Sequence, residues 1–242
     1  MDEVQQSQAE KPEASPRPPG RRPRRWVRWL WLLLPLLCAT MLGVGYLLVA
    51  LKREPEFYRQ SRAALEDREV RQAAVAAFET QAAELEVVSK SADEWRIEFS
   101  EQQINAWLWE EFPRWQPRVP AVHEPLVDLT EQSLHLGAQV ELPQYRGIVS
   151  VQIRPTVAPG PTLVIDVDDI RAGDLPIPAA RWIEQARAEI ERQQWPVRIE
   201  EEPTLKIVVD LTEIDSPWSR LPLTAIEIGE EQLTLIGGEP AE

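Results

Sequence analysis

The sequence predicts an α+β fold: one N-terminal transmembrane helix, a helical stem, and an antiparallel sheet with helices packed on one face. Three observations support it. Residues 29–51 form an uncharged apolar run, residues 54–90 are rich in helix-forming side chains, and apolar and polar residues alternate in most segments after residue 95. Alternation with a period of two is typical of strands that have one buried and one solvated face. We therefore expect four parts, at residues 1–25, 26–51, 52–92 and 93–238.

The first part reads as a disordered cytoplasmic tail. Residues 1–25 contain five prolines and a cluster of arginines but no apolar periodicity, a composition that does not build a packed core. The arginines can attract anionic headgroups, although their simpler role is to determine topology.

The uncharged run of 23 residues, 29–51, is long enough to cross a membrane. As a helix it measures roughly 35 Å, against a hydrocarbon core of about 30 Å. Trp26, Trp29 and Trp31 lie at its start, where indoles favour the membrane interface. The run exceeds the apolar core of a cleaved signal peptide and lacks a small-x-small site, and Leu37 before Cys38 argues against a lipoprotein. We expect an uncleaved signal-anchor.

The flanking charges predict the orientation of this anchor. A cluster of five arginines at residues 21–28 precedes it, whereas only Lys52 and Arg53 follow before the first acidic residues. The more basic flank stays in the cytoplasm. The sequence therefore predicts a single-pass protein of the plasma (inner) membrane, with its N-terminus in the cytoplasm and its C-terminal domain outside.

The charge of the outer part excludes one class of partner. The chain carries 26 basic and 40 acidic residues, of which the first 51 hold seven and four, so 19 basic and 36 acidic residues remain. A domain this acidic repels phosphate backbones, and we expect no nucleic-acid partner. The partners that we consider are the lipids of the membrane and a protein of the cell envelope. Cys38 is the only cysteine, so the outer domain forms no disulfide within the chain.

Residues 52–92 predict one or two helices, dominated by alanine, glutamate, glutamine and arginine. A coiled-coil dimer would need a more regular heptad seam, so we expect these helices to pack against the protein's own domain. A short strand follows in "WRIEFS", and Ser100 with Gln103 predicts a capping box. The next helix is expected over 101–112, with one apolar stripe and an end at Pro113. The stripe consists of Ile104, Trp107, Leu108 and Phe112.

The remaining segments predict an antiparallel sheet, with a hairpin at 158–162. Gly173 can turn the chain away from the sheet edge, while Pro176 cannot continue the ladder and Pro178 suits the first turn of a helix. We therefore expect a structural corner at Gly173, Pro176 and Pro178, followed by a helix over 179–194. Its apolar stripe, including Trp182 and Ile183, would dock on the sheet.

The strand that ends in a glycine, the "LPIP" corner, the helix, "WPVRIEEEPTLKIVVDL" and the last hairpin together resemble the YpmS-like family of bacterial membrane-anchored proteins of unknown function. "SEQQINAWL" is similar to that family's opening helix. The resemblance covers roughly residues 95–236 and implies one N-terminal span and an outer domain. It implies no catalytic residue.

The sequence offers little chemistry. His123 and His135 are the only histidines, one beside a proline-rich loop and one on a wet strand face, and "DVDD" reads as a solvated strand face more readily than as a calcium site. No nucleophile elbow, phosphate loop, HExxH or CxxC motif occurs. We therefore expect no enzyme activity, no cofactor and no metal site.

Tryptophan is the residue that stands out in the outer domain. Trp109 lies off the predicted stripe and Trp115 in the loop after it. Exposed indoles contact lipids or proteins, whereas buried ones would pack under the proline-rich connection. Two functions follow: an apolar groove that binds a lipid or other amphiphile of the envelope through Trp109 and Trp115, or a non-enzymatic module that binds an envelope protein through its acidic sheet face. An envelope hydrolase is a third, weaker reading.

Overall fold

The computed structural model describes residues 45–46, 49–91, 94–143, 145–178, 180–201, 204–213 and 222–238. By its internal contacts the chain divides into two units, residues 1–44 and 45–242, and only the second is treated below. Within the described residues no helix has the length and apolar character needed to cross a membrane. Most of the predicted anchor, including Trp26, Trp29 and Trp31, lies outside the described residues, as does the predicted tail.

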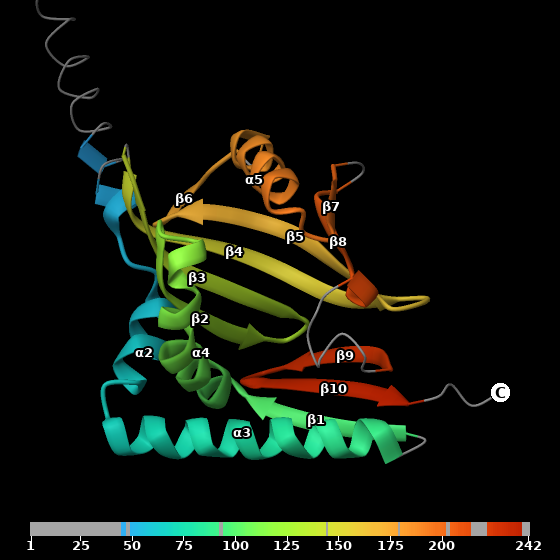
Figure 1. The fold of residues 1–242 in the computed structure, drawn as a ribbon. Helices are drawn as coiled ribbons and strands as arrows, with labels where there is room; N and C mark the ends of the chain where they lie inside the picture. The colour runs from blue at the N-terminus through green and yellow to red at the C-terminus, as the bar shows by residue number, and fades with distance from the viewer. Residues whose placement is uncertain are drawn as a thin grey trace, which may run out of the picture. The chain divides into compact units, whose positions relative to one another are not determined.

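The larger of two antiparallel sheets has seven strands (Figure 1). Its main path runs in the order β2-β3-β4-β5-β8-β7, and the short β6 pairs with β5. The strands are β2 (Val122–Thr130), β3 (Ser133–Leu142), β4 (Tyr145–Ala158), β5 (Thr162–Ala172), β6 (Leu175–Pro176), β7 (Val197–Glu200) and β8 (Lys206–Asp210). The predicted antiparallel sheet is confirmed, and β4 and β5 form the predicted hairpin at 158–162.

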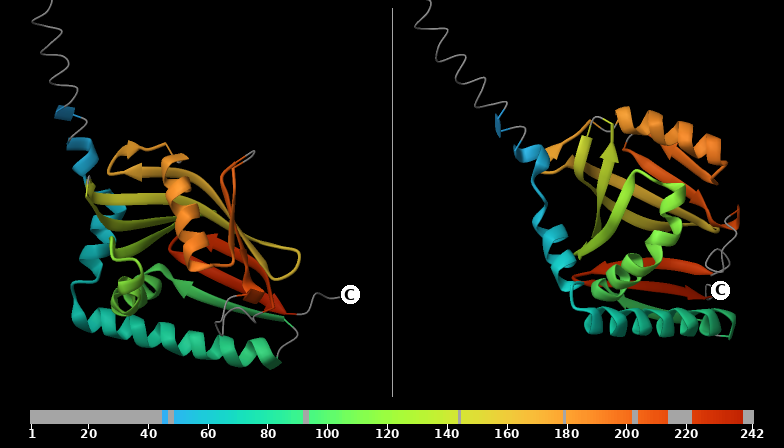
Figure 2. Two further views of the ribbon diagram at one scale, coloured as in Figure 1. Left: turned by 45° about the horizontal axis from the view of Figure 1, so that its top comes forward. Right: turned by 60° about the vertical axis from the view of Figure 1, so that its left-hand side comes forward.

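The smaller sheet has three strands in the order β1-β10-β9. They are β1 (Glu94–Ser100), β9 (Leu223–Gly229) and β10 (Gln232–Gly238). Helix α3 (Arg68–Ser91) runs alongside β1 in Figure 1 and in the views of Figure 2. Its Leu85 is fully buried in a cluster with Trp95, Ile97 and Phe99, the inward side chains of β1. The alternation in "WRIEFS" thus buries one face of the strand against α3.

Helix α4 (Glu101–Trp115) begins with the predicted capping box, in which Ser100 and Gln103 bond each other's backbone N–H groups. The expectation that it ends at Pro113 is wrong. A proline in the last turn removes only one backbone donor, so the helix continues to Trp115. The expectation of a single apolar stripe is also wrong, because Ile104 packs in the α3 cluster while Ala106 and Trp109 belong to a second cluster on the other side.

The outer edge of β2 is covered by polar side chains of α4. The Asn105 side chain is buried, accepts the N–H of Val127 at 2.7 Å and donates to its C=O at 2.8 Å. One turn earlier, Glu101 accepts the N–H of Leu129 at 2.8 Å. Unpaired edge groups attract other strands or leave buried polar atoms unsatisfied. The spacing of four residues puts both side chains on one face of the helix, where they complete the edge.

Glu101 gives the fold a pH dependence whose sign follows from its position. Burial raises the pKa of its carboxyl above the ordinary 4.5, and the hydrogen bond from Leu129 only partly opposes this. Between the unfolded and folded pKa values the folded chain binds more protons, so the free energy of unfolding falls as the pH rises through that window. Burial raises the pKa of Asp128 as well, which adds a contribution of the same sign.

We expect Glu101→Gln to weaken this dependence, because an amide cannot lose a proton. Denaturant unfolding of the full chain between about pH 5 and about pH 7 should show a smaller loss of stability in the variant than in the natural chain. Gln102→Ala, at an exposed position of the same helix that carries no ionisable side chain, is the matched control, and it should leave the slope unchanged. If Glu101→Gln left the pH dependence of the free energy of unfolding unchanged, Glu101 would not be its source.

Helix α2 (Glu56–Ala64) packs on the same side of the larger sheet as Ala106 and Trp109 of α4. Its Tyr58 is fully buried beside Leu65 and Leu126, and the phenol donates to the Glu124 carbonyl at 2.7 Å. A side chain at Gly137 would lie 2.9 Å from both Phe57 and Tyr58. The glycine of β3 thus makes room for the two aromatic rings of α2. The helices of 52–92 belong to the same compact unit as the sheets.

Helix α5 (Ala180–Gln193) follows the Gly173 turn and contacts β7. Ile183 is buried, and Arg187 donates to the carbonyl of Ile199 and pairs with Glu201. The side chain of Trp182 lies outside the described residues. The sequence predicts both main helices on one sheet face, whereas their chief contacts with the larger sheet are with its two edge strands, β2 for α4 and β7 for α5.

Candidate functional site

The two faces of the larger sheet differ sharply in chemistry. Side chains of one face are aliphatic on neighbouring strands, as the cross-strand pairs Leu136–Val151, Val151–Ile170 and Ile165–Ile207 show. We call this the apolar face. It comprises Val127, Leu129, Leu134, Leu136, Ala138, Val140, Val149, Val151, Ile153, Pro155, Val157, Leu163, Ile165, Val167, Ile170, Ala172, Ile207, Val209, Val197 and Ile199.

A β-bulge keeps this face continuous. The register between β4 and β5 shifts after Gln152, so that Asp168 has no partner on β4 and Ile153 pairs with Val167. In a regular strand the side chains of Val167 and Ile170 would point to opposite faces. The extra residue in the bulge shifts the alternation by one position, so that both point to the same face. Because of the bulge, Val167 and Ile170 both lie on the apolar face although they are three positions apart in the sequence. The alternation predicted for 163–168 did not reveal this shift.

The apolar face is only partly covered by the rest of the domain. Its side chains on β4 and β5 are partly exposed except that of Ala172, which is buried, and Ser150, the buried residue of β4, lies on the opposite face. Among the described residues of the larger sheet, buried apolar side chains occur on β2, β3, β5 and β8 but not on β4. A central strand in a closed two-layer domain would bury its aliphatic side chains. The middle of this sheet therefore presents an accessible apolar surface.

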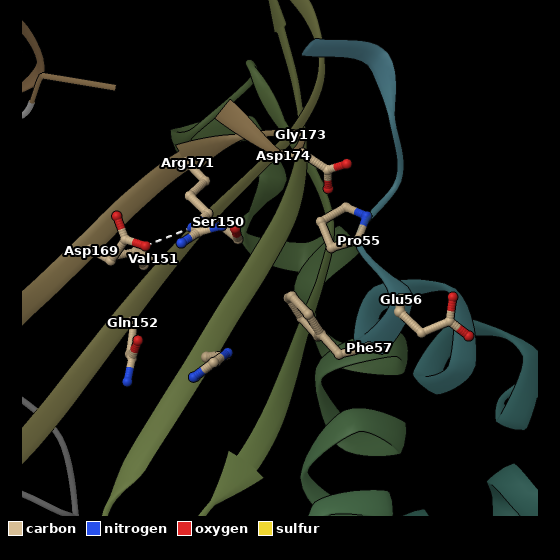
Figure 3. Close-up of a pocket in the computed structure, with 11 residues that line it drawn as sticks. Pro55, Glu56, Phe57, Ser150, Val151, Gln152, Asp169, Arg171, Gly173 and Asp174 are labelled. Carbon is tan, nitrogen blue, oxygen red and sulfur yellow. Dashed lines mark hydrogen bonds and ion pairs between the residues drawn. The ribbon is translucent and has the colours of Figure 1, made fainter. Parts of the chain in front are cut away.

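The opposite face carries apolar residues at its margins, among them Leu126 and Val208, but its middle is polar. There it holds a pocket of about 360 Å³ beside α2 (Figure 3). Its polar lining includes His135, Ser150, Gln152, Asp169 and Arg171, and Phe57 closes one side. The Arg171 guanidinium donates to Asp169 at 2.6 Å, and the two are joined by the dashed line in Figure 3. Such a volume and lining admit a small polar ligand.

His135 is the side chain of this pocket that could act as a general base. Its Nδ1 lies 3.8 Å from Asp128 on β2, and its ring meets Phe57 edge to face. Ser150 lines the same pocket, but among the described residues no hydrogen bond joins it to His135. A nucleophile activated by a base needs such a bond. His123 instead lies within hydrogen-bonding distance of Gln116, 2.5 Å away.

The aspartates of "DVDD" are each paired with a base. Arg154 binds Asp168 at 2.6 Å, Lys206 lies 3.3 Å from Asp166, and Arg171 binds Asp169. No group of His, Cys, Asp or Glu in the described part of the chain is arranged to hold a metal ion. The polar face of the sheet is thus a mosaic of both charges, not a bare acidic surface.

The two tryptophans singled out from the sequence lie in different surroundings. Trp109 is partly buried and packs against the cluster that contains Tyr58 and Leu126. Trp115 is 42% exposed at the end of α4 and touches Trp107 with ring centroids 5.4 Å apart. Neither belongs to the apolar face of the sheet. The alternation in the sequence predicted an apolar face on the sheet, but it did not predict that the middle of this face would be partly exposed.

The predicted corner at Gly173 holds the turn between β5 and β6. Gly173 has a φ of +59°, which favours glycine, and pairing ends at Pro176. Pro178 precedes α5, whose described residues start at Ala180. The turn also contacts the segment around Ala50, since Asp174 donates to the Ala50 carbonyl at 3.0 Å.

No protein-family model, curated protein or solved structure matches the chain in comparisons of sequence and fold. The resemblance to the YpmS-like family therefore stays a prediction from the motifs alone.

Proposed function

We propose that this chain is a single-pass, membrane-anchored protein whose outer domain binds the acyl chains of a lipid or another amphiphile of the cell envelope on the apolar face of its larger sheet. The observation that carries the proposal is the partial exposure of that face along β4, the central strand. An accessible aliphatic surface of this extent is typical of a site that awaits an apolar partner.

The energetics favour a chain-like ligand. Each methylene that leaves water for an apolar surface contributes about 0.8 kcal/mol, so an acyl chain of about a dozen methylenes gains several kcal/mol even after the cost of association. Aliphatic side chains on five neighbouring strands, β3, β4, β5, β8 and β7, line one face. These side chains can contact an extended acyl chain along its length, and they require only that the ligand be apolar.

The predicted location agrees with such a ligand. A domain tethered outside the cytoplasm by its own membrane helix has lipids within reach, and it needs no soluble carrier to supply them. The non-enzymatic module that binds an envelope protein is the alternative. Its predicted acidic surface receives less support, because the aspartates of the sheet are paired with Arg154, Lys206 and Arg171.

A photo-crosslinking amino acid tests this proposal in the full chain within native membranes. Placed at Ile165 on the apolar face, it should form a lipid adduct, identified by the added mass. Placed at Thr156, an exposed neighbour on the other face, it should form none beyond background. A protein adduct at Ile165 would favour the interaction module and overturn lipid binding, as would the absence of any specific adduct.

A further inference from the structure

The end of the predicted anchor is held by the outer domain itself. Residues 45–46 and 49–52 are helical, and Ala50, near the end of the apolar run, is only 4% exposed. Its carbonyl accepts the N–H of Asp174 at 3.0 Å. The Leu51 carbonyl accepts the Tyr145 hydroxyl at 3.4 Å, and Arg53 pairs with Asp174 at 3.3 Å. Two turns of the larger sheet, β3–β4 and β5–β6, thus contact the helix end.

Gly173 makes this contact possible. A Cβ added at this residue would overlap the Ala50 carbonyl oxygen and lie 2.8 Å from that of Leu51. Both atoms are backbone, so no side-chain rotation could relieve the clash. The N–H of Gly173 is itself bonded to the Ile148 carbonyl at 2.8 Å, which fixes the turn to β4. The helix end is therefore seated on the sheet without an intervening flexible linker.

Apolar side chains near this helix end are exposed. Tyr46 is 71% exposed and Val49 is 68% exposed, while Lys52 and Arg53 follow within one turn. Exposed apolar residues next to basic ones match the boundary between hydrocarbon and headgroups. We expect this surface to contact the outer part of the membrane that residues 29–51 are predicted to cross.

We propose that the outer domain lies directly on the membrane surface, with the β3–β4 and β5–β6 turns facing the headgroups, and that the apolar face takes its amphiphile from that leaflet. The source of the ligand rests on the proposed lipid binding, whereas the seating of the domain rests only on the proposed membrane anchor. Strand β4 starts at Tyr145 beside the docked helix end, and its 14 residues lead roughly 45 Å along the sheet. The apolar side chains thus begin next to the membrane and continue away from it.

Fluorescent labels on cysteine can measure this seating in the full chain. In a Cys38→Ser background, which removes the single natural cysteine, Arg146→Cys labels the β3–β4 end and Pro159→Cys labels the far end of β4. After reconstitution in vesicles of phosphatidylglycerol and phosphatidylethanolamine that carry a headgroup nitroxide, the label at 146 should be quenched several-fold more than the label at 159. Equal quenching at both positions would overturn the proposal.

Two glycine variants test the seat itself. Gly173 and Gly160 both have positive φ, at +59° and +84°, but no atom lies within 4 Å of a Cβ added at Gly160. Each change to alanine imposes a similar left-handed strain on the backbone, and only the added Cβ of Gly173→Ala meets the helix end. We expect Gly173→Ala to lose most of the preferential quenching at 146 and Gly160→Ala to keep it.

The outcomes separate this inference from the proposed function. Preferential quenching at 146 without a lipid adduct at Ile165 would support the position of the domain on the membrane and reject lipid binding on the apolar face. A lipid adduct at Ile165 with equal quenching at both labels would support lipid binding on the apolar face and reject the position of the domain on the membrane. Should Gly173→Ala fail to fold by circular dichroism, the comparison of the two labels in the otherwise natural chain still decides the question.

Discussion

Replacement of Asn105 by leucine is expected to lower the free energy of unfolding by about 2–5 kcal/mol. The side chain is 2% exposed and satisfies both backbone groups of Val127. Leucine has a similar volume but can neither donate nor accept, so one N–H and one C=O would be buried without partners. Each orphaned group costs about 1–3 kcal/mol. Denaturant unfolding of the full chain in mild detergent measures the effect.

Gln102→Leu is the matched control, because Gln102 is exposed on the same helix. It should change the stability by no more than about 0.5 kcal/mol. If Asn105→Leu were equally mild, water or a shift of α4 would have to replace the lost bonds, and the account of the β2 edge would be incorrect.

Truncation of Tyr58 to alanine is expected to cost about 3–5 kcal/mol. The ring is fully buried between α2 and the sheet, and its hydroxyl donates to Glu124. Burial also raises the pKa of the phenol, as expected for a hydroxyl held away from water. The variant removes both the packing and the hydrogen bond that hold α2 in place, and thermal or urea unfolding reports the loss.

Two further variants divide this effect into its parts. Tyr58→Phe keeps the ring and should cost about 1 kcal/mol, the value of one hydrogen bond. Arg59→Ala changes the next residue, whose side chain is 65% exposed, and should be nearly neutral. A small effect of Tyr58→Ala would mean that α2 is only loosely attached and that residues 52–92 act as a separate stem.

Local patterns in the sequence predicted many elements of this fold. Alternation of apolar and polar residues located β1, the β4–β5 hairpin and the strands β3 and β8, because each pattern reflects one buried or apolar face. The Ser100–Gln103 capping box depends only on residues three apart, and it is confirmed. The turn at Gly173 was predictable from the conformational freedom of glycine followed by prolines.

The features that define the candidate site depend on contacts between distant residues. The bulge at Asp168 is set by the pairing with β4, and nothing in "DVDD" distinguishes it from a regular strand. Trp109 lies off the predicted helix stripe because α4 packs on two sides, which a single periodicity does not show. The partial exposure of the apolar face depends on how little of it the other elements cover.

A crosslinking scan along β4 tests the central claim most directly. The photo-reactive residue is placed in turn at each position from 149 to 157 except the proline, in the full chain within native membranes. If lipid lies on the apolar face, adducts should appear with a period of two, at Val149, Val151, Ile153 and Val157, and not at Ser150, Gln152, Arg154 or Thr156. Lipid adducts without this alternation, or with the opposite phase, would contradict the account.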